Sequence, residues 1–382
     1  MERENLKGRI DWITTLIPFV IVLAMMLVFM LIPTQSKLFV DTLRGFFGDT
    51  IGIYYVILGL GCVLLSLYLA FKDKYGQIKL GNIDKPVYSN FAWGTMIFTS
   101  TMAADIMFYS LIEWALYGAE PHVAELGKMQ LWAPTFPLFH WGPLAWGFYV
   151  VLAISFAFMM HVRKRERQRF SEAMRPLIGA RVDGPWGKVI DIVAVFAMVC
   201  ATATTFSLAT PLLASALASV FGISTSVTLT IGILLLICAV YTITVLLGMN
   251  GISKLASFCS YMFFAILFYF LFLGGETRYI VETGFQSLVN MVQNFIGLST
   301  YMDPLRENNF PQTWTIYYWA YWLVWCIATP FFIALISKGR TIKNLVFGTF
   351  GWGLAGTYMS FIILGNYGLA QQLKHGLDVT GY

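Results

Sequence analysis

Aromatic side chains are the residues of this sequence whose types and spacing could do chemistry. The segment TWTIYYWAYWLVW, residues 313–325, holds seven aromatic rings in thirteen positions and no charge. Four of these rings recur at intervals of four, four and three residues, so they share one face of a helix. At 1.5 Å per residue the stripe is about 16 Å long, and an interfacial aromatic belt explains only its outer end. The four rings are Trp314, Tyr318, Trp322 and Trp325.

A second aromatic cluster, FHWGPLAWGFY at residues 139–149, contributes Trp141, Trp146 and Tyr149. The electron-rich faces of several rings attract a quaternary ammonium group through cation–π contacts, each worth about 0.5–2 kcal/mol in a desolvated site. Rings that converge from two helices would form an aromatic box, which binds such a cation without a hydrogen-bond donor. The alternative is that the rings only pack helix against helix.

The composition indicates a membrane protein. Of the 382 residues, 58% are hydrophobic and 12% are charged, and the mean hydropathy is +0.70. Soluble domains carry about 25% charged residues. Nine apolar segments are each long enough to cross a hydrocarbon core of about 30 Å as a helix. They cover residues 12–33, 49–71, 88–115, 141–162, 189–219, 226–248, 255–274, 312–336 and 344–365.

Basic residues predict the orientation of these spans. Most of the 25 Lys and Arg residues fall on the cytoplasmic side if the N-terminus is cytoplasmic. The net charge of +5 is then explained by orientation and by contact with anionic lipid, so no nucleic-acid partner is expected. The run RKRERQR at 163–169 is interpreted as one such cytoplasmic anchor.

Other kinds of chemistry are not indicated. The five cysteines form no CxxC pair, so neither a disulfide framework nor a zinc site is predicted. The four histidines are scattered, and nucleophile-elbow, P-loop and dinucleotide-binding motifs are absent. We therefore expect no enzyme, no catalytic residue, no metal and no cofactor.

Residues 275–311 link two spans and carry a different pattern. Apolar residues recur at helical spacing with polar residues between them, which predicts an amphipathic helix at the outer interface or against a neighbouring subunit. The apolar positions are Val281, Phe285, Leu288, Val292 and Phe295.

The aromatic segment, followed by ISKGRTIKN at 336–344, resembles the signature of the betaine/carnitine/choline transporter family. That signature is a W-T-x-x-Y-W-A-W-W run that ends in S-R-G-R-T. The cluster at 139–149 resembles the family's fourth helix, especially in its carnitine-type members, and ATTFSLATP at 203–211 is a further match. The resemblance covers essentially the whole chain. It implies an all-α protein of the inner membrane with a leucine-transporter-type inverted-repeat fold, of which nine of twelve expected transmembrane helices are present.

The resemblance also implies how the chain is organised. Residues 1–87 would hold two leading helices, 88–274 the first five-helix repeat, 275–311 an extracellular loop with the amphipathic helix, and 312–382 two helices of the second repeat. The segment 280–298 would join copies of the chain into a homotrimer.

Six positions match the family's aromatic box. Among them, Trp322 is expected to face the ammonium group of a choline, carnitine or betaine substrate. The six are Trp141, Trp146 and Tyr149 of the fourth helix and Tyr321, Trp322 and Trp325 of the eighth.

The third helix departs from the family pattern. Thr101–Asp105 stands where the family has a glycine-rich G-M-G-I-G stretch, so a carboxylate replaces glycines within the membrane. Asp105 has three open roles: a counter-ion that favours choline over zwitterions, a proton carrier, or a cap for a broken helix. An acid at this point resembles choline-type members, whereas the fourth helix resembles carnitine-type members. Glu113, where the family has Glu-Pro, is expected in a vestibule or at a helix end.

The coupling ion stays open between Na⁺ and H⁺. Cys259 matches the position at which sodium-independent carnitine exchangers carry an arginine, so no built-in positive charge replaces sodium. Asp105, Met102 and Cys259 are the candidate residues for ion or proton coupling. The predicted function is secondary transport of a quaternary ammonium compound. The alternatives are a transport-inactive membrane binding or scaffold protein, or a fragment of the transporter.

Overall fold

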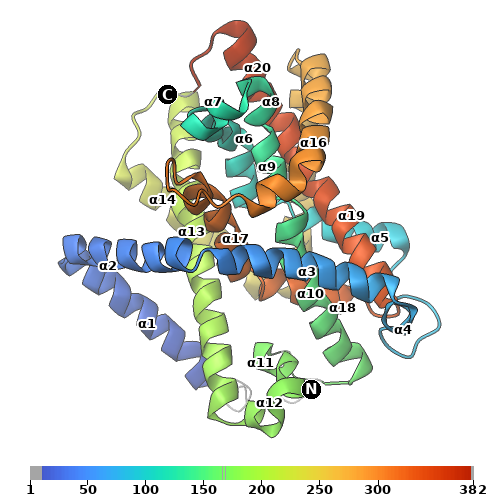
Figure 1. Cartoon of the computed structure of the whole chain (residues 1–382). Helices are drawn as coiled ribbons and strands as arrows, with labels where there is room; N and C mark the ends of the chain where they lie inside the picture. Colours follow the sequence, from blue (N-terminus) through green and yellow to red (C-terminus); the bar gives the residue numbers. More distant parts are fainter. Residues whose placement is uncertain (1–10, 166, 168, 380–382) are drawn as a thin grey trace. The chain divides into compact units, whose positions relative to one another are not determined.

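The computed structural model of the chain describes residues 11–165, 167 and 169–379, so residues 166 and 168 of the basic run lie outside the description. Throughout these residues the elements are helical, with one isolated β-bridge between Lys79 and Thr341. The longer helices are α1 (Trp12–Leu31), α2 (Pro33–Gly45), α3 (Ile53–Phe71), α5 (Asn90–Thr99), α6 (Ala104–Gly118), α10 (Pro143–Ala157), α13 (Pro185–Phe221), α14 (Val227–Leu246), α15 (Gly248–Phe268), α16 (Thr277–Thr300), α17 (Ile316–Val324), α18 (Ala328–Ile336), α19 (Ile342–Ser360) and α20 (Asn366–His375) (Figure 1).

The helices of the structure are those expected of an all-α membrane protein. Among the described residues, seven helices are long and apolar enough to cross a membrane, and up to nine if each of two bent helix pairs is one span. An apolar run forms a helix in a bilayer because its backbone groups find no water to bond. The unbroken spans are Trp12–Leu31, Ile53–Phe71, Met129–Val162, Pro185–Phe221, Val227–Leu246, Lys254–Leu273 and Ile342–His375.

The first bent pair is α5 with α6, at 64°. The break between them contains no glycine. The backbone N–H groups of Ser100, Thr101 and Met102 bond to the carbonyls three residues before them, so α5 ends in tight turns. Ser100 Oγ donates to the carbonyl of Ile97 at 2.6 Å, and Thr101 Oγ1 donates to that of Phe98 at 2.7 Å, so these two carbonyls accept a second hydrogen bond.

The second bent pair joins Pro311–Val324 to α18 at 55°. Pro330 lies in the first turn of α18 and has no N–H to continue the hydrogen-bond ladder from the preceding helix. The aromatic segment therefore ends at Trp325, which caps α17. The single span expected over 312–336 is in fact two helices.

The described chain divides into two compact units. Unit 1 comprises Met1–Gly94, Pro143–Thr202 and Thr300–Gly351. Within it α3 packs along α10, and α17 and α18 pack against this pair (Figure 1). The helices approach closely because each contributes a glycine: a Cβ at Gly59 would lie 2.8 Å from Leu144, and one at Gly147 would lie 2.8 Å from Val63. Small residues at such crossings are typical of membrane helices.

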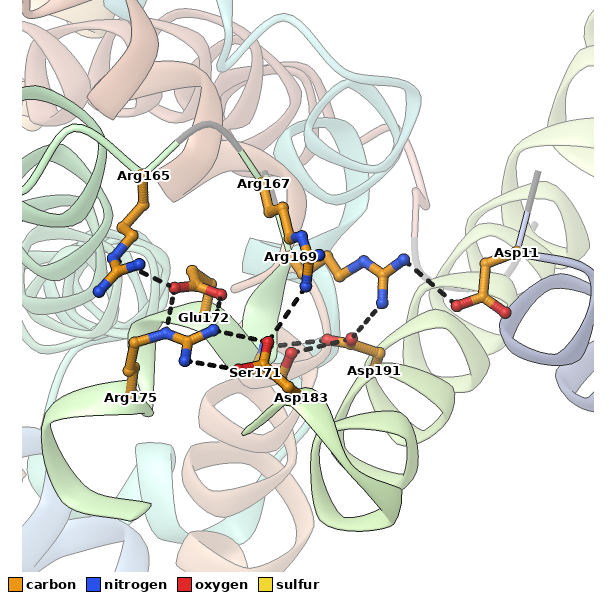
Figure 2. A network of polar contacts seen from close by, with 9 residues as sticks. All are labelled: Asp11, Arg165, Arg167, Arg169, Ser171, Glu172, Arg175, Asp183 and Asp191. Atoms are coloured by element: carbon orange, nitrogen blue, oxygen red, sulfur yellow. Dashed lines mark hydrogen bonds and ion pairs between the residues drawn. The ribbon is translucent and has the colours of Figure 1, made fainter. Parts of the chain in front are cut away.

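The basic loop before α13 also belongs to unit 1, and its arginines are paired with acids (Figure 2). Arg175 binds both Glu172 and Asp183, the latter at 2.8 Å. Arg169 lies 3.3 Å from Asp11 and 3.9 Å from Asp191. The loop therefore ties the start of α1 to α13, and part of the positive charge assigned to lipid contact is neutralised within the protein.

Unit 2 comprises Thr95–Gly142, Ala203–Ser299 and Trp352–Tyr382. Here α6 packs against α9 (Thr135–His140), α20 and the π-helical turn η7 (Phe361–Gly365). Trp114 stands where the resembled family has the proline of its Glu-Pro pair, and it is buried against Gly368. A Cβ added at Gly368 would lie 2.9 Å from the indole nitrogen of Trp114. The helix expected over 280–298 is present as α16. The predicted division into consecutive segments and the trimer stay predictions.

Candidate functional site

Three of the expected box residues meet in unit 1. Trp146 and Tyr149 lie on α10, Trp322 lies on α17, and all three side chains are at most 6% exposed. The ring centroid of Trp322 lies 5.5 Å from that of Trp146 and 4.7 Å from that of Tyr149. The Trp146 and Tyr149 rings lie 5.6 Å apart. We call these three residues the ring cluster.

The geometry of the ring cluster is that of rings in direct contact. The interplanar angles run from 51° to 79°, and aromatic pairs favour such inclined arrangements at centroid distances of 4.5–7 Å. An ammonium group binds within about 6 Å of a ring centroid, over the ring face. In this packed arrangement it would use outer faces of the rings or separate them on entry.

Two further pairs of rings in the aromatic segment stack along the chain. The ring of Tyr321 stacks on Tyr317 at 6.2 Å, and that of Trp314 stacks on Tyr318 at 6.3 Å. The buried indole N–H of Trp325 has no hydrogen-bond partner among the described residues. An indole N–H is a donor only, so Trp325 could bind an oxygen of a ligand.

The segment that ends the signature has a structural role in unit 1. The Arg340 guanidinium donates to Asn90 Oδ1 at 2.8 Å and to the backbone carbonyls of Tyr88 and Ser89. It also lies 4.0 Å from the ring centroid of Trp93. Arg340 therefore fixes the chain that follows α18 to the start of α5.

Trp141 and Asp105 belong to unit 2. Trp141 follows α9, and its ring lies 5.5 Å from Tyr109 and 5.3 Å from Phe361. Its indole N–H donates to Glu113 Oε2 at 2.7 Å. The structure thus places Trp141 in a polar network as well as among rings, which the sequence pattern did not indicate.

Asp105 is buried in the first turn of α6, directly after the break. Its Oδ1 accepts a hydrogen bond from the backbone N–H of Ile106 at 3.0 Å. A carboxylate is stabilising at a helix N-terminus, where backbone N–H groups are open. This contact supports a capping role and leaves the counter-ion and proton-carrier roles as hypotheses.

The expectation for Glu113 is wrong. Its carboxyl group is fully buried in α6, away from either helix end, and is not part of an exposed vestibule. Donors from Trp141 and Tyr117 explain the burial, since a buried carboxyl group requires hydrogen bonds. The i, i+4 spacing of Glu113 and Tyr117 was the signal available in the sequence.

The other two candidates for ion or proton coupling, Met102 and Cys259, lie in different environments. Met102 is at the α5–α6 break and packs against a buried cluster that includes Phe263 and Leu267. Cys259 is exposed on α15. The described residues contain no group of three or more His, Cys, Asp or Glu side chains that could hold a metal ion.

Comparisons with known proteins agree with the resemblance. The family model described as BCCT, betaine/carnitine/choline family transporter, matches residues 13–382. The chain is 27% identical over 328 residues to the uncharacterized transporter YeaV of Escherichia coli (strain K12). This match covers 85% of this chain and 67% of YeaV. It is 34% identical over 304 residues to a probable glycine betaine transporter of Desulfitobacterium hafniense (strain Y51), covering 78% of this chain and 59% of that one. The chain thus spans about three-fifths to two-thirds of the length of these relatives.

Proposed function

This chain belongs to the betaine/carnitine/choline transporter family, a family of integral membrane transporters rather than enzymes, and we propose that it carries a quaternary ammonium compound by secondary transport. The expected setting is the inner membrane with the N-terminus in the cytoplasm. We further propose the inverted-repeat fold of the family and a homotrimer. The exposed apolar residues of α16 support the trimer, namely Val281, Phe285, Val289, Val292 and Ile296.

The observation that carries the proposal is the ring cluster. Trp146, Tyr149 and Trp322 come from two helices that are distant in sequence, and they meet in a buried place. Buried aromatic faces attract a permanent cation without demanding a hydrogen bond, which a quaternary ammonium group cannot give. By resemblance to the family, Trp141, Tyr321 and Trp325 are further candidates for substrate binding.

The substrate class is choline, carnitine or betaine, and two features favour different members. The relative named a probable glycine betaine transporter and the open indole N–H of Trp325, which suits a carboxylate oxygen, favour a zwitterion. An ionised Asp105 near the ammonium would favour choline, because it would repel a substrate carboxylate. Coupling to Na⁺ or H⁺ would involve Asp105, Met102 or Cys259.

Transport is tested with the full-length protein in proteoliposomes. Uptake or counterflow of radiolabelled glycine betaine, carnitine and choline is measured under a sodium gradient, under a proton gradient and without a gradient. Saturable flux of one of the three supports the proposal. Binding of these compounds without flux under any gradient would indicate the transport-inactive alternative, and an absence of both would refute the proposal.

A further inference from the structure

We propose that Glu113, Tyr117 and His140 form a proton-binding site in unit 2. All three side chains are 0% exposed. The Tyr117 hydroxyl donates to Glu113 Oε1 and lies 2.5 Å from Nδ1 of His140, while that nitrogen is 3.9 Å from Glu113 Oε1. Tyr117 therefore connects a carboxyl group to an imidazole through two hydrogen bonds.

This chain of hydrogen bonds is complete in two protonation states. In the first state Glu113 is a carboxylate that accepts from the Tyr117 O–H, and the Tyr117 oxygen accepts from Nδ1–H of His140. When a proton is added at Nε2 of His140, the Nδ1 proton passes to Tyr117 and the Tyr117 proton passes to Glu113. Glu113 then donates to Tyr117, Tyr117 donates to Nδ1, and His140 is again neutral, so one proton has been gained.

The elements that pack around this site carry other titratable groups, which also contribute to any response to pH. On α6 itself, Asp105 and Tyr109 share the face of Glu113 at intervals of four residues. The turn η7 carries no titratable side chain. On α7 (Pro121–Leu126), which packs on α6, His122 lies 3.9 Å from Glu125. On α20 the titratable residues are Tyr367 and the pair Lys374 and His375, and this pair binds Glu276.

The two acids of α6 accept from different kinds of donor. Oδ1 of Asp105 accepts from the backbone amide of Ile106. Oε1 of Glu113 accepts from the phenol of Tyr117, which contacts the imidazole of His140, and a phenol and an imidazole can pass on a proton.

Trp141 is one of the residues expected to bind the substrate, and it also contacts the proton site. Its indole N–H donates to the second oxygen of Glu113 at 2.7 Å. Hydrogen bonds to an ionised acceptor are roughly twice as strong as neutral ones, so proton uptake by Glu113 loosens the hold on Trp141. Substrate binding and proton binding are then linked, and the inference in this respect rests on the proposed function.

The first test needs no substrate. Infrared difference spectra of the full-length protein are recorded across a pH titration in H₂O and D₂O, and the C=O stretch of protonated carboxyl groups is followed. We expect a pH-dependent band that is lost in Glu113→Gln and kept in Asp105→Asn, the matched loss of an acid from the same helix face. Tyr117→Phe, which interrupts the relay, should keep the band and slow proton uptake at least about tenfold.

A pH-dependent carboxyl spectrum that Glu113→Gln leaves identical to the wild type would overturn the proposal. Size-exclusion elution and circular dichroism confirm that the variants are folded. Should Glu113→Gln not fold, the slower proton uptake expected of Tyr117→Phe decides instead, and unchanged kinetics there refute the relay.

The second test measures the pH profile of glycine betaine and choline binding. Binding to the wild type should change with pH, and binding to Glu113→Gln should not. An equal pH dependence in both proteins contradicts the linkage. If the carboxyl band behaves as expected and no ammonium compound binds, the proposed function fails while the proton site stands. If ammonium binding is found and the band does not depend on Glu113, the proton site fails alone.

Discussion

Replacement of Trp322 by leucine tests the ring cluster directly. Trp322 is the ring that contacts both Trp146 and Tyr149, at 5.5 and 4.7 Å between centroids. Its loss removes one aromatic face and releases the other two from their packed arrangement. Each desolvated cation–π contact contributes about 0.5–2 kcal/mol, so we expect Trp322→Leu to weaken ammonium binding by about 1–3 kcal/mol, or roughly five- to a hundredfold.

Isothermal titration calorimetry of the detergent-solubilised protein with glycine betaine and choline measures this effect. Trp314→Leu and Trp319→Leu are the matched controls: Trp314 lies at the outer end of the same stripe, and Trp319 is a fully buried ring on the same helix. Both should bind within about twofold of the wild type. Equal weakening in Trp322→Leu and the controls would mean that the rings serve packing, and the proposed box would be refuted.

Three more outcomes follow from the loop network and from α16. Arg175→Gln should raise amide hydrogen exchange in the loop, because Arg175 joins Glu172 to Asp183, whereas Arg165→Gln should change it little; equal effects would contradict this. Hydrogen bonds from Arg175 hold the pKa values of Glu172 and Asp183 below their usual range, so this stabilisation is present at neutral pH and is lost as the pH falls through the lowered values. Protection of the loop amides, measured relative to the intrinsic exchange rate at each pH, should therefore fall in acid, and protection that does not fall would refute that sign. Phe285→Asp should convert the proposed trimer to monomers in light scattering, and a surviving trimer would place the interface elsewhere.

The spans could be predicted from the sequence because a bilayer leaves an apolar run few choices. The first segment was expected at 12–33 and is Trp12–Leu31, and the sixth was expected at 226–248 and is Val227–Leu246. In water such boundaries depend on tertiary packing, but here every backbone group must be bonded within its own helix. The same rule does not locate a break, which depends on local features such as the tight backbone turns at Ser100 and Thr101.

The polar network of unit 2 could not be predicted from spacing alone. The pair Glu113 and Tyr117 is visible at i, i+4, but His140 and Trp141 come from the far end of another segment. A scattered histidine carries no sequence signal until its neighbours in space are known. The acid partners of the arginines at 163–169 could not be predicted for a related reason, since counting basic residues ignores acids that return to them from later in the chain.

The two breaks lie next to the residues to which we assign function. Asp105 follows the first break by two residues, and the second break begins at Trp325, three residues after Trp322. A broken membrane helix is tolerated only where its open backbone groups are satisfied by protein or line a cavity, and in transporters such helices form the binding site. Backbone turns to the carbonyls of Ile97, Phe98 and Thr99 satisfy part of the first break. The chain therefore has two interrupted helices, one beside a carboxylate and one beside an aromatic cluster, which is the kind of helix break that transporters place at their binding sites.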